Sequence, residues 1–183
     1  MKIWNLSIAA LVAGLAFGAQ AQRVSEPENP SIAVAEAPPA RSNQSRAQVE
    51  FLVEALRTSL AEARLGELAT RQSYNARVRD YGTQLRTDHT AQATQIEGML
   101  EPLGVTIPTE PSAEALSHLA VLERLTGTEF DAAFVQLMIW SHTEAIEQYG
   151  AQTHANPDRA LHDFASKSLP MLREHLAAAE ALR

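Results

Sequence analysis

The sequence predicts an all-α protein built as a four-helix bundle with one crossover connection. From Asn43 onward the chain is rich in Ala, Leu, Glu, Gln and Arg, and its apolar residues recur at helical rather than strand spacing. Two long helical stretches are followed by a segment with three prolines and a glycine, and then by two more helical stretches. This order is typical of a bundle whose middle connection crosses from one end to the other.

The first two helices are predicted at residues 43–73 and 75–101. The first carries apolar residues at helical spacing, with Glu62 placed among them. The second has one stripe made of Leu85, His89, Ile96 and Met99. The segment PLGVTIPTEPS then ends the helical pattern, and a shorter helical piece at 112–125 completes the crossover.

The last two helices follow Gly127 and Asn156. The third has a stripe made of Phe134, Val135, Met138, His142, Ala145 and Tyr149. For the fourth, Asn156 is predicted as the N-cap and Pro157 as the first helical residue, where its missing N–H costs nothing. Its stripe is Leu161, Ala165, Ser168, Leu172, His175, Ala179 and Leu182, and Pro170 inside it is expected to kink the helix.

The N-terminal region is expected to direct export. Lys2 precedes an apolar run at 3–17, and Ala19-Gln20-Ala21 has the small-x-small form that signal peptidase accepts. We therefore predict a signal peptide at residues 1–21 and a periplasmic location. The alternative, an uncleaved anchor, is disfavoured because the run is shorter than the roughly 20 apolar residues that span a bilayer.

Three segments follow from this division of the chain. Residues 22–42 hold four prolines and no helical period, which is typical of a disordered linker. Residues 43–183 form the predicted bundle domain.

Without Lys2 the net charge of −7 becomes −8, so we expect no nucleic-acid partner and no stable membrane anchor after signal cleavage. A protein partner or a homo-oligomer is compatible with this composition.

A cluster of polar residues on the predicted buried stripes is the main functional signal. Counting residues from the interhelical turns, at about 1.5 Å per residue, places Glu62, His89 and His142 within one helical turn in height. The same count places His175 roughly 9 Å lower if the helices are straight. The chain has no cysteine, so a metal must be held by histidine, carboxylate or water.

We therefore predict a metal site with one ligand from each long helix, namely Glu62, His89, His142 and His175. Asp88 and Glu174 each precede a histidine and turn about 100° away from it, so they are predicted to support the ligands from outside. Imidazole with carboxylate suits iron, zinc, manganese or copper. The alternative is a metal-free polar layer in which Glu62 accepts hydrogen bonds from the imidazoles. No catalytic residue and no organic cofactor site are predicted, because no phosphate loop, dinucleotide fingerprint or nucleophile elbow is present.

Several motifs, taken in order, resemble a widespread bacterial family of exported proteins of unknown function, often labelled "predicted outer membrane protein". They are FLVEALRTSLAEARLGELA, LRTDHTAQ, GVTIP, GTEFDAAFVQLMIWSHTEAI and FASKSLPMLREHLAAA. The resemblance covers residues of about 47 to 182 and implies a ferritin-like four-helix bundle. The positions that match the family's recurring motifs are Glu62, Gly66, Asp88, His89, Phe130, Asp131, His142, Pro170 and His175.

These features lead to one functional hypothesis and two alternatives. The first is an exported, periplasmic helical bundle that binds a transition metal through the Glu and His layer, in envelope stress or metal handling. The second is a non-enzymatic interaction or structural module whose histidines form a structural polar layer. The third is a metal-dependent oxidoreductase. It is less favoured because the Glu-x-x-His motif of di-iron bundles is absent: the residues three before the histidines are Arg86, Ile139 and Leu172.

Overall fold

The computed structural model describes residues 39–155 and 158–183, which contain only helices and their connections. The helices are α1 (Pro39–Gln72), α2 (Ala76–Leu100), a 3-10 helix η1 (Glu101–Leu103), α3 (Ala113–Leu122), α4 (Gly127–Ala155) and α5 (Arg159–Glu180). No strand occurs in these two ranges, so the all-α prediction is confirmed. The predicted signal peptide and residues 22–38 of the predicted linker lie outside the described residues.

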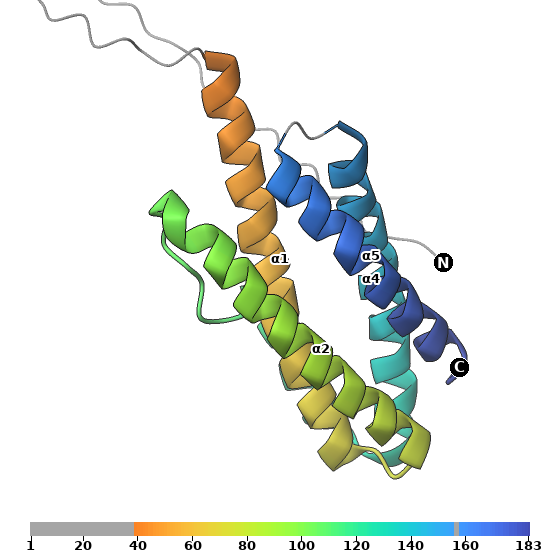
Figure 1. Cartoon of the computed structure of the whole chain (residues 1–183). Helices are drawn as coiled ribbons and strands as arrows, with labels where there is room; N and C mark the ends of the chain where they lie inside the picture. Colours follow the sequence, from red (N-terminus) through yellow and green to blue (C-terminus); the bar gives the residue numbers. More distant parts are fainter. Residues whose placement is uncertain (1–38, 156–157) are drawn as a thin grey trace, which may run out of the picture. The chain divides into compact units, whose positions relative to one another are not determined.

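The long helices pack as two antiparallel pairs, α1 with α2 and α4 with α5 (Figure 1). The connection from α2 to α4 holds η1 and α3, and α3 packs against α1 and α4. Two boundaries differ from those predicted. Helix α1 begins at Pro39 rather than after the linker, and the N-cap of α5 is Asp158, whose carboxylate accepts hydrogen bonds from two backbone N–H groups of the first turn.

Two glycines bring α1 and α2 into close contact. A Cβ at Gly66 would lie 2.8 Å from the backbone nitrogen of Arg86, and a Cβ at Gly82 would lie 2.7 Å from both the Gly66 carbonyl oxygen and the Ala69 Cβ. A side chain larger than hydrogen does not fit at Gly66 or Gly82, because the atoms that it would meet include backbone atoms of the facing helix, which cannot rotate away. Gly66 follows Glu62 by one helical turn, so this contact holds the α1 and α2 backbones together beside the polar residues.

The apolar core is divided into two clusters by a polar layer. On α1 the first cluster includes Leu56 and the second begins at Leu65, and Glu62 lies between them. On α4 the clusters are likewise separated between Met138 and Ala145, where His142 lies. The same holds for His89 on α2 and His175 on α5. Each long helix therefore contributes one ionisable residue to the level that separates the two apolar clusters.

Candidate metal centre

The polar layer consists of one carboxylate and three imidazoles that are almost entirely shielded from solvent. Glu62 and His89 are each 1% exposed, and His142 and His175 are 0% exposed. Burying a charged or polar group costs free energy unless it gains a partner. The partners of these four side chains therefore decide what the layer can do.

The closest approach in the layer joins Glu62 to His89. The Glu62 Oε2 and His89 Nε2 atoms are 2.8 Å apart, yet neither has a hydrogen-bond partner. The separation is short enough for a hydrogen bond, so it is the direction of the ring nitrogen that fails. The Glu62 Oε2 atom is also 3.8 Å from His142 Nε2. A cation bound by Glu62 Oε2 and the two Nε2 atoms would give all three atoms a partner.

Each imidazole uses its other ring nitrogen to donate a hydrogen bond. His142 Nδ1 lies 2.9 Å from the Met138 carbonyl oxygen, which can only accept. His175 Nε2 lies 2.9 Å from the Asp88 carboxylate, and His89 Nδ1 lies 3.2 Å from the Gln92 amide oxygen. In a neutral ring these partners place the proton on the nitrogen that they contact and leave the other nitrogen with a free lone pair.

The free nitrogens converge. His142 Nε2 lies 3.3 Å from His175 Nδ1, and one ring nitrogen from each of the three histidines lies within 4.8 Å of the others. Donor atoms bound to one ion at about 2.0 to 2.2 Å lie roughly 3 to 3.5 Å apart. The separations of 2.8 Å between Glu62 and His89, 3.3 Å between His142 and His175 and 3.8 Å between Glu62 and His142 bracket this range. Histidine ligands of metals also commonly donate their second N–H to a carboxylate or carbonyl. The residues present therefore fit a metal ion with nitrogen and oxygen ligands.

Glu62 is held as an anion. Burial alone would raise the pKa of its carboxyl group, but attraction to His142 and His89 outweighs burial and lowers the pKa well below its usual range. The Ser141 hydroxyl donates a hydrogen bond of 2.6 Å to Glu62 Oε1, which favours the charged form and leaves Oε2 facing the histidines. The layer thus places one negative charge beside the imidazoles of His89 and His142.

His175 is held neutral. Burial and the neighbouring His89 together lower the pKa of its imidazole to about 4, although the Asp88 carboxylate opposes this change. A neutral imidazole is the form that binds metals. The charge of the layer therefore attracts a cation, and its nitrogens are free to coordinate one.

The structure brings His175 beside His142, although residue counting along straight helices puts it roughly 9 Å lower. The helix bounds and the direction of the side chains both reduce this separation. His142 lies 13 residues before the end of α4 and His175 lies 16 residues after the start of α5, so the two differ by 3 residues, or about 4.5 Å, in height. In a helix the Cα–Cβ bond tilts toward the N-terminus, so His142 on α4 points away from the α4–α5 turn and His175 on α5 points toward it. Residue counting from the turns ignores this tilt and overstates their separation.

The two acidic residues predicted to support the ligands differ in their positions. Asp88 contacts His175 rather than the adjacent His89. Glu174 is exposed and makes no hydrogen bond or ion pair with the layer within the described ranges.

Three residues beside the layer were not predicted from the sequence, namely Gln92, Ser59 and Ser141. Gln92 lies three residues after His89, on the same helix face, and its amide oxygen also accepts a hydrogen bond of 2.9 Å from Ser59. Polar residues at this spacing on a buried stripe are the signal that could have found Gln92.

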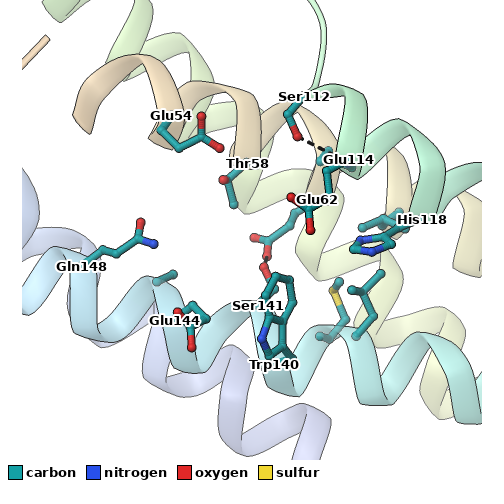
Figure 2. A pocket seen from close by; sticks show the side chains of 16 residues that line it. Glu54, Thr58, Glu62, Ser112, Glu114, His118, Trp140, Ser141, Glu144 and Gln148 are labelled. Carbon is teal, nitrogen blue, oxygen red and sulfur yellow. Dashed lines mark hydrogen bonds between the residues drawn. The ribbon is translucent and has the colours of Figure 1, made fainter. Parts of the chain in front are cut away.

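One surface pocket reaches the layer. It has a volume of about 150 Å³ and lies between α1, α3 and α4, and both Glu62 and Ser141 line it. Figure 2 shows these two side chains meeting between α1 and α4, with Glu54, Glu114 and Glu144 placed around them. The pocket connects solvent with the one ligand residue that carries a charge.

A family model described as a domain of unknown function (DUF4142) matches residues 33–182. The chain belongs to this family. The match covers all five α-helices in full, and it includes every residue of the polar layer. No curated protein matches the chain.

Two solved structures share the fold. A DUF305 protein from Streptomyces coelicolor, described as a candidate secreted protein, superposes with a TM-score of 0.63 at 12% identity, covering 74% of this chain and 91% of that one. A DUF305 fragment from Deinococcus radiodurans gives a TM-score of 0.65 at 20% identity, covering 74% and 93%. Among the described residues, no helix is long and apolar enough to cross a membrane.

Proposed function

We propose that this DUF4142 protein is a ferritin-like four-helix bundle of the bacterial periplasm that binds one transition-metal ion in its core and serves in metal handling. The ligands are Glu62 Oε2, His89 Nε2, His142 Nε2 and His175 Nδ1. The observation that carries the proposal is that each imidazole has a hydrogen-bond acceptor at one ring nitrogen, so its other nitrogen is free in the neutral ring. Beside these rings the unpartnered Glu62 Oε2 lies 2.8 Å from His89 Nε2 and 3.8 Å from His142 Nε2.

The donor set defines the class of ion. Three imidazole nitrogens with one carboxylate oxygen suit zinc, iron, manganese or copper. Calcium and magnesium prefer sites made of oxygen atoms, so this donor set does not suit them. A single carboxylate among the ligands also argues against a di-iron centre, which uses several. Four protein donors complete a tetrahedral set, whereas catalytic centres keep a position for water or substrate. Binding is therefore favoured over catalysis.

A cobalt titration tests the proposal. Metal-free protein is titrated with Co²⁺, whose visible absorption reports nitrogen and oxygen ligands, and the melting temperature is measured in parallel. We expect about one equivalent to bind and to stabilise the fold, because an ion that binds only the folded state raises its stability. The His89→Ala/His142→Ala variant should lose both signals.

A second variant separates loss of ligands from loss of the fold. Glu62→Gln keeps the volume of the side chain and removes its charge, so the helices should form while Co²⁺ affinity drops. Wild-type protein that shows neither Co²⁺ absorption nor stabilisation by Co²⁺ or Zn²⁺ would overturn the proposal and leave the layer as a structural polar layer.

A further inference from the structure

We infer that the pocket between α1, α3 and α4 is the entry path by which a divalent metal cation reaches the layer, and that Glu54, Glu114 and Glu144 attract it. This inference rests on the proposed function, because it assigns a route and a charge-based selection to the same site. The entry path affects the rate at which the metal ion binds, and the ligands alone do not determine this rate.

The charges around the pocket have one sign. Glu54 comes from α1, Glu114 from α3 and Glu144 from α4, and all three are exposed. No lysine or arginine is found among the described residues that line the pocket. The basic group of Arg57 is 3.7 Å from Glu54, and its side chain is 43% exposed, so solvent screens much of its effect. Carboxylates around a concave surface raise the local concentration of cations and their rate of arrival.

The residue at the inner end of the pocket also indicates that a cation binds there. Glu62 lines the pocket, is 1% exposed, and has an Oε2 atom with no hydrogen-bond partner. A cation that passes the three outer carboxylates therefore meets a buried anion with free coordinating capacity. Figure 2 shows this sequence of side chains, with the outer carboxylates around Glu62 and Ser141.

The pocket on the other side of the layer is a poorer route. It is lined by Asp88, Gln92 and Lys167 among others. Asp88 and Gln92 contact the N–H sides of His175 and His89, away from the lone pairs. Lys167 adds a positive charge that repels a divalent cation. Of these two pockets, the one on the Glu62 side is lined by a proposed ligand residue.

The test compares two triple variants that change the net charge equally. In the pocket variant Glu54, Glu114 and Glu144 become glutamine. In the control variant three exposed glutamates that do not line the pocket become glutamine, namely Glu147, Glu174 and Glu180. Stopped-flow absorption follows Co²⁺ binding to metal-free protein at ionic strengths of about 0.01 M and about 1 M, where charges are screened over about 30 Å and about 3 Å.

We expect the pocket variant to slow Co²⁺ association about tenfold at low ionic strength, with an unchanged dissociation rate. High ionic strength should bring wild type and variant to the same rate. The control variant should differ from wild type by less than about twofold. Because Glu114 lies in the first turn of α3, where a negative charge favours the helix, Glu54→Gln and Glu144→Gln are also measured singly. Each should slow association without lowering the melting temperature.

Equal slowing in both triple variants would show a general effect of net charge, and no slowing in the pocket variant would show another route. Either result overturns the entry path and leaves the metal site intact, because the saturating Co²⁺ stoichiometry is unaffected. Wild-type protein that binds no Co²⁺ at equilibrium would overturn the site and the path together.

Discussion

His142 Nε2 and His175 Nδ1 lie 3.3 Å apart although both rings already donate their N–H groups elsewhere, to Met138 and to Asp88. When both rings are neutral, two lone pairs therefore face each other in an interior shielded from solvent. This arrangement is unfavourable unless a positive species lies near both atoms, because each nitrogen has lost its hydrogen bonds to water. A metal ion held jointly with Glu62 and His89 satisfies all four groups at once.

Neutralising Asp88 should weaken metal binding. Asp88→Asn removes the charge behind His175 and makes its ring a poorer donor of electrons to the ion, so we expect Co²⁺ affinity to fall by about tenfold or more. The matched control is Glu174→Gln, because Glu174 also precedes a histidine but is exposed and does not contact the layer. Equal Co²⁺ affinities in calorimetric titrations of the two variants would contradict this role for Asp88.

A methyl group at Gly66 should separate α1 from α2. The added Cβ would meet backbone atoms of Gly82 and Arg86, so the two helices must move apart beside the polar layer. We expect Gly66→Ala to lower the free energy of unfolding by about 3 kcal/mol, at the upper end of overpacking effects, and to weaken Co²⁺ binding as well.

Gly98→Ala is the control for this change. A Cβ at Gly98 has no atom within 4 Å, and the position lies inside α2. Alanine there should stabilise the protein by about 0.5 to 1 kcal/mol, because alanine is the better helix former. Urea unfolding of both variants measures the difference. A destabilised Gly98→Ala, or a Gly66→Ala as stable as wild type, would contradict the close contact of these backbones.

Acid should destabilise the metal-free protein over a defined range. Burial lowers the pKa of His175 to about 4, against about 6.5 in an unfolded chain, so between these values the unfolded state binds more protons. The stabilisation is complete above about pH 6.5 and is lost as the pH falls toward 4, by an amount on the order of 3 kcal/mol. The lowered pKa of Glu62 adds a loss of the same sign at still lower pH.

Chemical unfolding of chelator-treated protein between pH 7.5 and pH 4 measures this dependence. A His175→Asn variant should show a flatter curve across the upper part of the range. Free energies of unfolding that do not change between these pH values would contradict the burial of a neutral His175.

The sequence predicts the helices well because their signals are local. The stripes on the four long helices and the prolines of the crossover depend on neighbouring residues only. The N-cap of the last helix was misplaced. Asn156 followed by Pro157 satisfies the same local rule as Asp158, and the structure uses Asp158.

The polar layer depends on contacts between helices, and this limits what residue counting can reach. Counting from the turns places Glu62, His89 and His142 in one layer, and their side chains meet in the structure. It does not reach His175, because it ignores the tilt of side chains toward each helix N-terminus. Residue counting also does not show that Asp88 on α2 accepts a hydrogen bond from His175 on α5, because this contact depends on how the two helices are rotated about their axes.

Elemental analysis of the wild-type protein tests the central claim most directly. The protein is purified from the periplasm without chelator or a metal-affinity tag, and metals are counted by mass spectrometry beside the His89→Ala/His142→Ala variant. The account predicts about one zinc, iron, manganese or copper ion per chain and its loss in the variant. Less than about a tenth of an equivalent in the wild type, with no stabilisation when these metals are added back, would contradict it.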